Sequence, residues 1–486
     1  MGGLAKALKA LLKNPHVRSD APVKVVIALK KELCDTVSRV ADTVRAQEKS
    51  RAVLRASGLS AHVLRSESFA PRHILAGRKT VTAEVAVADL EKFAKSPAVE
   101  YVRPMRLHKM HLDVSVPMLG VDVTVTKEFD GSGVRVAVID SGIDATHPDL
   151  KGRVRLDLSR NFTSEGAATD VHDGNGHGTH VAGIIGGAGA KYRGVAPGVE
   201  FISCKVFDSQ GRAGDEGAIQ AAVGWAVDHG AEVINYSGGY SPIDADGNVL
   251  VDPPWVWQLD LMEEEVEFAN AMDRGIVSVV SAGNDGDYGR RATLSMPATC
   301  PAVISVGATD KNRKLDSFSS VGPALRSAKV SPKEIVLTLS AALRPVKSFP
   351  EVDLIVPGGG VDYNAAKAGA CFYTGGIISL LAKNAVDMKP ICFVDKRYVR
   401  LSGTSQAAPH VTGLSALILQ AAKKLGANLG PKRAYVVKGI LRKASTKIAG
   451  YTRFEQGKGF PAWSAIRDLL DDLASGKTSP ETLLKA

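Results

Sequence analysis

The sequence predicts an α/β protein in which a mostly parallel, doubly wound sheet follows a small α+β domain. Short runs of apolar, β-branched residues alternate with helical patterns from Val134 to Ala308, as in parallel sheets that carry helices on both faces. Several runs stop at polar residues next to glycine, and open α/β sheets build their sites at the carboxyl ends of their strands. A separate strand and helix pattern precedes this region.

The N-terminal region shows the order β-α-β-β-α-β, which is the split βαβ plan. We expect a domain over residues 21–111, preceded by an amphipathic segment over residues 1–20; an unrelated small α+β domain is the alternative. The expected elements are a strand at Val23–Leu29, a helix at Leu33–Leu54, strands at Ala61–Leu64 and Val81–Val87, a helix opening at Ala88–Ala94 and a strand at Val99–Val102.

Residues 112–474 are expected to form the larger α/β domain, and residues 475–486 a tail. The strand patterns are continuous apolar runs, which is typical of strands buried on both faces. The expected elements are strands at Val134–Asp140, Glu200–Val206, Ala231–Asn235, Ile276–Ser281 and Val303–Ala308, and helices from about His177, at Ala218–Asp228 and at Leu261–Arg274.

The composition is ordinary, but the charge is unevenly placed. Of 486 residues, 45% are hydrophobic and 23% are charged, as is typical of globular proteins. The net charge is +10; residues 1–111 carry 21 Lys and Arg against 10 Asp and Glu, and the remainder carries 40 against 41. A larger domain without net positive charge argues against nucleic acid as a partner. No stretch of the sequence is apolar and long enough to predict a transmembrane segment.

The cysteines and the N-terminus bear on the compartment. The cysteines number five, and no Cys-x-x-Cys occurs; this does not indicate a disulfide framework and is compatible with a reducing compartment. Lys6, Lys9 and Lys13 interrupt the first apolar stretch, so we expect no secretory signal there. A cytoplasmic protein is expected, and a secreted protein whose leader is missing from the sequence is the alternative.

Three motifs place reactive side chains at the ends of expected elements. The strand at Val134–Asp140 ends on a carboxylate, and glycine-rich backbone leads into a helix at His177. The turn Gly403-Thr404-Ser405 precedes an apolar helix with Pro409 in its first turn, where proline is tolerated because the first N–H groups have no partner. A histidine held by a carboxylate can accept a serine proton, and the helix start stabilises negative charge.

Each motif also has a simpler explanation. Ser405 is compatible with a plain N-cap, and Asp140-Ser141-Gly142 with a turn. His172, His177 and His180 suggest a zinc site, but they lack the helical His-Glu-x-x-His spacing and lie in glycine-rich backbone, which is a poor platform for ligands. No Gly-x4-Gly-Lys-Ser/Thr loop for phosphate is present.

Four segments together resemble the subtilisin-like serine proteases (subtilases) over about residues 112–470. The aspartate, histidine and serine motifs follow the chain order of subtilisin, and an asparagine segment lies between the last two. The segments are Asp140-Ser141-Gly142, His177-Gly178-Thr179-His180, Ser281-Ala282-Gly283-Asn284 and Gly403-Thr404-Ser405-x-Ala407-Ala408-Pro409. The resemblance implies a subtilisin-like fold and a serine endopeptidase that forms an acyl-enzyme.

The resemblance also implies a role for each motif. Ser405 is the expected nucleophile, His177 its general base and Asp140 the group that orients the imidazole. The Asn284 amide and the Ser405 backbone N–H are the expected oxyanion hole. A larger apolar residue is usual in the family at Gly238, so more room is expected there. The expected substrate-binding residues are Ser237, Gly238, Gly239, Ser281, Ala282 and Gly283.

The domain over residues 21–111 resembles the inhibitory propeptide of subtilases, including its closing Val-x-Tyr-Val strand. This implies a zymogen whose N-terminal domain inhibits the same chain and is removed by autocatalytic cleavage near His111–Leu112. The expected partners are protein or peptide substrates and this intramolecular inhibitor. The alternatives are a specialised exopeptidase or peptide-maturation protease with a restricted cleft, and a catalytically idle binding protein.

The chain departs from the family in several places. Insertions are expected at about residues 241–258, 323–351 and 365–400. The chemistry requires no cofactor. Structural calcium sites recur in the family, but Ile184–Arg193 is short and has no Asp or Asn, so the loop of the tight site is expected to be missing. Whether calcium or another metal binds is left open by the sequence.

Overall fold

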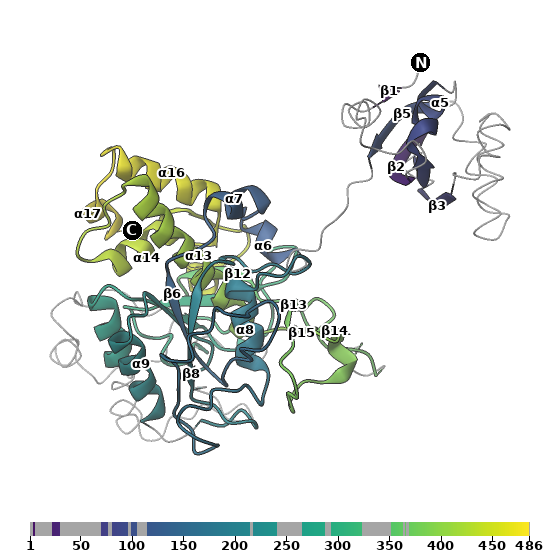
Figure 1. The fold of residues 1–486 in the computed structure, drawn as a ribbon. Helices are drawn as coiled ribbons and strands as arrows, with labels where there is room; N and C mark the ends of the chain where they lie inside the picture. The colour runs from purple at the N-terminus through teal and green to yellow at the C-terminus, as the bar shows by residue number, and fades with distance from the viewer. Residues whose placement is uncertain are drawn as a thin grey trace. The chain divides into compact units, whose positions relative to one another are not determined.

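The computed structural model describes residues 3–4, 22–29, 70–75, 80–95, 99–104, 114–213, 217–240, 265–286, 293–322, 351–362, 365 and 369–485. The chain divides into two compact units, Met1–Lys109 and Met110–Ala486, and Figure 1 labels their elements.

The first unit contains a mixed sheet in the order β1-β5-β2-β4-β3. Its strands are β1 (Gly3–Leu4), β2 (Pro22–Leu29), β3 (Ala70–Leu75), β4 (Thr80–Ala86) and β5 (Val99–Pro104). A 3-10 turn, η3 (Val87–Asp89), leads into α5 (Leu90–Lys95), where Leu90 is fully buried. Strand β3 was not predicted. The helix expected at Leu33–Leu54 and the strand expected at Ala61–Leu64 lie outside the described residues.

The second unit is built on a seven-stranded sheet in the order β12-β11-β10-β9-β6-β8-β7. Every pair of neighbouring strands is parallel, so the predicted α/β fold with a parallel sheet is confirmed. The strands are β6 (Arg135–Asp140), β7 (Arg160–Asn161), β8 (Glu200–Lys205), β9 (Val233–Tyr236), β10 (Val277–Ser281), β11 (Ile304–Thr309) and β12 (Leu354–Pro357). The strand order reverses at β6, where the chain passes from β8 to β9, and ligands bind such sheets at the carboxyl ends of strands near this reversal.

Helices cover both faces of this sheet. Helix α9 (Ala218–Asp228) packs on β6 and β8, whereas α8 (His177–Gly186) packs on β6 and on α13 (Thr404–Leu425). In Figure 1, α8 and α9 lie to either side of these strands. Helix α13 is buried along most of its length and contacts β9 to β12. Among the helices in the described ranges, none is long and apolar enough to cross a lipid bilayer.

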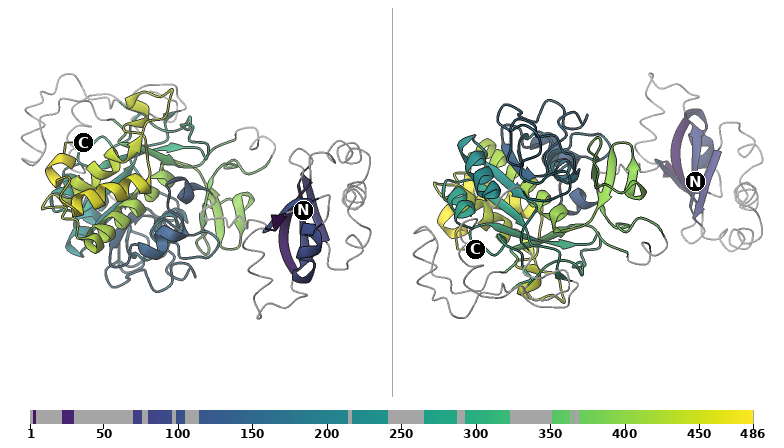
Figure 2. Two further views of the ribbon diagram at one scale, coloured as in Figure 1. Left: turned by 90° about the horizontal axis from the view of Figure 1, so that it is seen from above. Right: turned by 90° about the horizontal axis from the view of Figure 1, so that it is seen from below.

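The C-terminal helices pack together against α13. Figure 2 shows them gathered on one side of the second unit. Residues 475–485, expected as a tail, include α17 (Pro480–Leu483), whose Leu483 is fully buried. Gly439 allows this approach, because a Cβ there would collide with the Leu483 carbonyl oxygen. The remaining elements are α6 (Ser115–Met118), α7 (Val123–Glu128), α14 (Arg433–Lys443), α15 (Arg453–Gln456), α16 (Trp463–Ala474), β16 (Ser445–Thr446), β17 (Phe460–Pro461) and a helical stretch at 265–273.

A small antiparallel sheet lies in the insertion expected at residues 365–400. Its strands β13 (Ile377–Leu380), β14 (Phe393–Asp395) and β15 (Tyr398–Leu401) follow the order β13-β15-β14, and the 3-10 turn η5 (Pro390–Cys392) precedes β14. A disulfide joins Cys371 to Cys392, which the cysteine spacing did not indicate. Cys204 and Cys300 are free and buried. The insertions expected at 241–258 and 323–351 fall almost wholly outside the described residues.

Candidate active site

Asp140 is the last residue of β6, and its side chain is completely buried. The strand ends there because Gly142 turns the chain with a φ of +109°. A Cβ at this position would lie 2.6 Å from the Val171 carbonyl oxygen, so only glycine fits. The Ser141 N–H donates a 2.8 Å hydrogen bond to Asp140 Oδ1. The carboxylate is thus held in a defined orientation at the carboxyl edge of the sheet.

His177 is the first residue of α8, and its Nδ1 lies 2.8 Å from Asp140 Oδ1. The helix start can approach the strand end because Gly178 has no Cβ; one would overlap the Gly142 carbonyl oxygen. Burial alone would lower the pKa of His177, but the charge of Asp140 and its hydrogen bond outweigh burial and raise the pKa. The two side chains therefore form a pair in which the carboxylate favours the imidazolium.

Ser405 is the second residue of α13, and its hydroxyl donates to the Ser237 carbonyl oxygen at 3.1 Å. In return, the Ser237 hydroxyl donates to the Ser405 carbonyl oxygen at 3.0 Å. Helix α13 begins earlier than expected, so Pro409 lies inside it. Proline has no N–H for the carbonyl four residues before it, and the Ser237 hydroxyl satisfies that carbonyl instead. Ser405 is thus bonded to the end of β9, and its hydroxyl proton is directed at Ser237 rather than at His177.

Asn284 follows β10, and α13 fixes the orientation of its side-chain amide. Its Oδ1 accepts hydrogen bonds from the Thr404 backbone N–H at 2.9 Å and from the Thr404 hydroxyl at 3.1 Å. Oxygen must face these donors, so the amide Nδ2 faces away from them. A Cβ at Gly403 would come within 3.4 Å of Nδ2. Gly403, the residue before α13, therefore leaves space next to the Nδ2 donor.

The expected substrate-binding residues follow two neighbouring strands. Ser237, Gly238 and Gly239 come after β9, whereas Ser281, Ala282 and Gly283 end or follow β10. The Ser281 hydroxyl donates to the Gly238 carbonyl oxygen at 3.4 Å and joins the two segments. The expectation of extra room at Gly238 is wrong, because a Cβ there would lie 2.8 Å from Phe207 Cζ. Phe207 stacks on Tyr236 and fills the space of the missing side chain.

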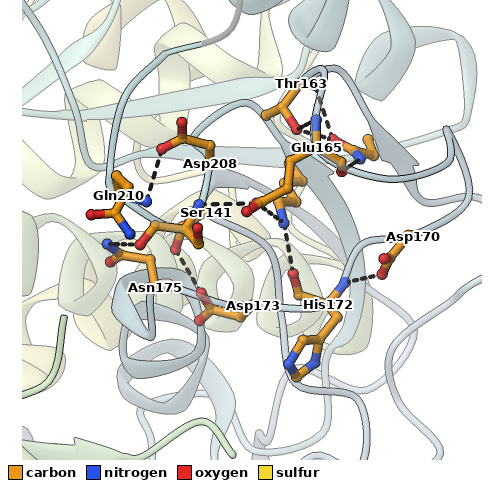
Figure 3. Close-up of polar contacts among 12 residues, drawn as sticks. Ser141, Thr163, Glu165, Asp170, His172, Asp173, Asn175, Asp208 and Gln210 are labelled. Atoms are coloured by element: carbon orange, nitrogen blue, oxygen red, sulfur yellow. Dashed lines mark hydrogen bonds and ion pairs between the residues drawn. The ribbon is translucent and has the colours of Figure 1, made fainter. Parts of the chain in front are cut away.

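A buried carboxylate, Asp173, organises the turn before His177, and sequence reasoning missed it. Asp173 Oδ1 accepts hydrogen bonds from the Gly176 N–H at 2.7 Å and the Ser141 hydroxyl at 2.9 Å, and Oδ2 accepts from the Thr179 N–H at 2.8 Å. Figure 3 shows the contact with Ser141. Burial raises the pKa of Asp173, although the hydrogen bond with Thr179 opposes the shift. Asp173 thus supplies the capping bond that Gly176, which has no side chain, cannot make.

An ion pair between Lys205 and Glu165 was also missed. Lys205 Nζ is 3.0 Å from Glu165 Oε2 and donates to the His172 carbonyl oxygen at 3.0 Å. The same Glu165 oxygen accepts the Ser209 N–H at 2.9 Å, and Asn175 Nδ2 donates to the Ser209 carbonyl oxygen at 3.3 Å. Figure 3 shows Glu165, His172 and Asn175 in this network. One ion pair therefore joins the loop before His177 to the loop after β8.

His180 and His410 have structural partners. His180 Nε2 is 3.1 Å from the Ile377 carbonyl oxygen, and burial lowers the pKa of His180 to about 3. His410 Nε2 is 2.8 Å from the Ser115 hydroxyl, and burial lowers its pKa to about 4. Within the part of the chain that the structure describes, no three His, Cys, Asp or Glu side chains are placed to hold a metal ion. The zinc interpretation of His172, His177 and His180 therefore has no support.

Comparisons with known proteins point to one family. The sequence profile of the Subtilase family matches residues 131–460. Subtilisin DY of Bacillus licheniformis is 31% identical over 64% of this chain and 86% of its own length. The major intracellular serine protease of Bacillus subtilis is 30% identical over 60% of this chain and 70% of its own length. The crystal structure of the epidermin leader peptide processing serine protease of Staphylococcus aureus superposes with a TM-score of 0.55 at 17% identity, covering 94% of this chain and 100% of that one. This last likeness concerns the fold alone.

Proposed function

Because the chain belongs to the subtilase family of serine proteases, we propose that Ser405, His177 and Asp140 together hydrolyse peptide bonds in protein substrates. The observation that carries the assignment is the 2.8 Å contact between His177 Nδ1 and Asp140 Oδ1. A carboxylate at this distance holds the proton on Nδ1, so the Nε2 lone pair is free to accept another.

The reaction starts when the Ser405 hydroxyl exchanges its hydrogen bond to the Ser237 carbonyl oxygen for one to His177. His177 takes the hydroxyl proton as Oγ bonds to the carbonyl carbon of the substrate. The oxyanion then receives hydrogen bonds from the Ser405 backbone N–H and from Asn284 Nδ2. Thr404 supports this role, because its two hydrogen bonds to Asn284 Oδ1 keep Nδ2 as the available donor.

The tetrahedral intermediate collapses when His177 gives its proton to the leaving amine, and an acyl-enzyme remains on Ser405. Water then attacks the ester, with His177 again accepting a proton, and the second collapse returns that proton to Ser405 Oγ. Each role is filled by a side chain or a backbone N–H, so we propose that the chemistry requires no cofactor. The rate of peptide hydrolysis is expected to stay the same directly after a chelator of metal ions is added. An immediate loss of activity would contradict the proposal.

The assignment is tested with a fluorophosphonate probe, which labels activated serines. Wild-type protein should be labelled at Ser405 and should hydrolyse denatured casein, whereas Ser405→Ala should do neither. Ser402→Ala is a matched control on the same segment, because the Ser402 hydroxyl is bonded to Gly360 and not to the site. Labelling of a different residue in the Ser405→Ala protein would place the nucleophile elsewhere.

We further propose that the protein is a zymogen and that the first unit inhibits the second within the same chain. The support is the resemblance of residues 21–111 to a subtilase propeptide, the excess of positive charge in residues 1–111, and a division into units at Lys109–Met110. Autocatalytic cleavage is proposed between Pro104 and Leu112, near the His111–Leu112 bond.

Incubation of the purified full-length protein tests this proposal. Wild type should give two fragments whose junction, read by N-terminal sequencing, lies within this stretch, and Ser405→Ala should remain whole. Addition of the isolated N-terminal fragment to the mature enzyme should then inhibit it. A wild-type protein that is active while uncut and is not inhibited by the fragment would rule out maturation by cleavage.

A second candidate function is a protease dedicated to peptide maturation. The observation that favours it is a segment from the 365–400 insertion that packs directly on the loop before His177: the Val386 N–H donates to the Gly174 carbonyl oxygen at 2.9 Å. Such a segment limits the space beside the catalytic pair. Cleavage mapping on a random peptide library separates the candidates, since a maturation enzyme should cut few sequences and a general endopeptidase many.

A further inference from the structure

The segment Leu381–Cys392, here called the strap, connects β13 to β14 and touches the loop that carries His177. The Val386 N–H donates to the Gly174 carbonyl oxygen at 2.9 Å. A Cβ at Gly176 would lie 2.8 Å from Ala385 Cβ and from Met388 Cγ. Gly176 immediately precedes His177, so the strap is in van der Waals contact with the residue next to the catalytic imidazole.

Three further interactions hold the strap in place. The disulfide Cys371–Cys392 closes one end. The Lys383 N–H donates to Asp144 Oδ2 at 2.9 Å near the other end. In the middle, Met388 and Cys392 are buried in a small apolar cluster with Val399, against which Tyr373 packs. The strap is therefore anchored on both sides of its contact with the histidine loop.

Asp387 lies between Val386 and Met388, which both contact that loop. Its side chain is exposed, and in the described ranges its carboxylate has no hydrogen bond or ion pair. The strap's own cations, Lys383 and Lys389, are not paired with it. A carboxylate whose neighbours on both sides are fixed, and which has no partner of its own, is positioned to bind a cation from outside the chain.

Asp387 directly precedes Met388, and the Tyr373 ring packs against the apolar cluster that contains Met388. Burial alone would lower the pKa of His177, but the charges of Asp140, Asp173 and Asp387 together raise it. Burial, and after it the charge of Asp387, raises the pKa of the half-buried Tyr373. The charge of Asp387 thus favours the imidazolium form of His177 and the neutral form of Tyr373. A carboxylate beside an aromatic ring is a favourable receptor for ammonium and guanidinium groups.

We propose that Asp387 and Tyr373 form a subsite for a Lys or Arg side chain of the substrate, within two residues of the scissile bond. The proposal rests on the proposed function, because only with His177 as general base does the bond to be cut lie beside the strap. The alternative is a solvated surface acid with no effect on substrate choice, and substrate profiling separates the two.

The test compares wild type with Asp387→Asn on a peptide library that varies each position near the cut. Wild type should prefer Lys or Arg at one position, and Asp387→Asn should reduce the ratio of kcat/KM for basic over neutral peptides at that position about fivefold, as expected for one partly exposed charge pair. Asp387→Glu should retain the preference. Asp387→Lys should reverse it in favour of Asp and Glu, which loss of folding cannot imitate.

Asp395→Asn is the matched control. It removes the same charge from the same insertion, at the last residue of β14, whose side chain pairs with Lys191 at 3.4 Å. This variant should keep the wild-type preference. Equal effects of Asp387→Asn and Asp395→Asn, or a wild type indifferent to basic residues, would overturn the proposal. The preference should also weaken as salt is raised from 0.05 to about 0.5 M.

The pH dependence of kcat/KM provides a second test of the position of Asp387. The charged groups that act on His177 are Asp140 at the end of β6, Asp173 in the preceding turn and Asp387 on the strap. Asp387→Asn should move the acid limb of kcat/KM to lower pH, whereas Asp395→Asn should not. If wild type is labelled at Ser405 and cuts neutral peptides but shows no basic preference, the subsite is disproved and the proposed function stands. If Ser405 is not labelled, the proposed function itself fails.

Discussion

Lys205 Nζ lies 3.0 Å from Glu165 Oε2, and Lys205 stands opposite Asp140 in the register of β6 and β8. The lysine side chain is only 4% exposed and the glutamate side chain 43%. Through its bond to the His172 carbonyl, this pair ties the end of the central strands to the loop that carries His177. The position of the imidazole thus depends on a charge pair that takes no part in the chemistry.

Glu165→Gln is expected to lower kcat about tenfold, because removing one partner leaves Lys205 charged and buried and loosens the loop before His177. The free energy of unfolding should fall by about 2 kcal/mol. Denaturant unfolding and kcat on a soluble peptide measure the two effects. Glu200→Gln, at the other end of β8, makes the same chemical change in a half-exposed pair with Arg135 and should change both quantities little. Equal effects of the two substitutions would remove the link to catalysis.

Asn284→Ala should lower kcat about 100- to 1,000-fold with little change in KM, which is the size of loss known for this kind of change in subtilisin itself. The reason is that the amide meets the substrate oxygen as charge develops on it, so the contact strengthens in the transition state. Steady-state kinetics on one peptide provides the measurement. Asn312→Ala, at an exposed turn, is the control. A raised KM with unchanged kcat would mean that Asn284 only binds substrate.

The acid limb of kcat/KM should have its midpoint above pH 6.5, the ordinary pKa of histidine, because Asp140 and its hydrogen bond outweigh the effect of burial and raise the pKa of His177. His177 must be neutral to accept a proton, so activity rises with pH through this pKa. The same shift means that protonated His177 stabilises the fold below pH 6.5 and that this contribution disappears as pH rises through the folded-state pKa. A midpoint below 6.5 would contradict the assignment.

Gly238→Ala should lower kcat/KM, because the new methyl group would lie 2.8 Å from Phe207 Cζ and 3.1 Å from the Tyr236 ring. It must displace the backbone of an expected substrate-binding residue. The loss is expected to be about tenfold. Phe207→Ala in the same protein should restore part of the rate, because it removes the group that the methyl meets. If the double variant is as slow as the sum of the single effects predicts, the two residues do not share the space.

Leu483→Ala should lower the free energy of unfolding by about 2–4 kcal/mol, the usual cost of truncating a fully buried leucine. Leu483 has no solvent exposure. Leu156→Ala is the control, because Leu156 is 58% exposed, and it should change the free energy of unfolding little. Urea denaturation monitored by tryptophan fluorescence gives both values. A loss below about 0.5 kcal/mol for Leu483→Ala would mean that α17 does not pack stably on α14.

The elements that carry the site were predictable because each shows a local pattern. Each pattern predicts a helix or strand boundary at the reactive residue. The patterns are an apolar run that stops at Asp140, a glycine-rich stretch before His177 and an apolar helix after Ser405. Strand β6 and helices α8 and α13 start or end at these boundaries or within a few residues of them.

What could not be predicted depends on contacts between distant residues. The orientation of the Asn284 amide follows from hydrogen bonds to Thr404, 120 positions away. Glu165 meets Lys205 across 40 residues, and nothing in the spacing of the two charges distinguishes them from a solvated pair. The space at Gly238 was misjudged because the ring that fills it comes from Phe207, on a different strand end.

The disulfide between Cys371 and Cys392 encloses only 21 positions of sequence and lies apart from the seven-stranded sheet. Opening it should lower the free energy of unfolding by about 3 kcal/mol, as for a loop of this length, and release one end of the strap. Reduction of the disulfide should therefore weaken the proposed preference for Lys and Arg. The preference of the same protein can be measured with the strap fixed and with it released, by changing only the redox buffer.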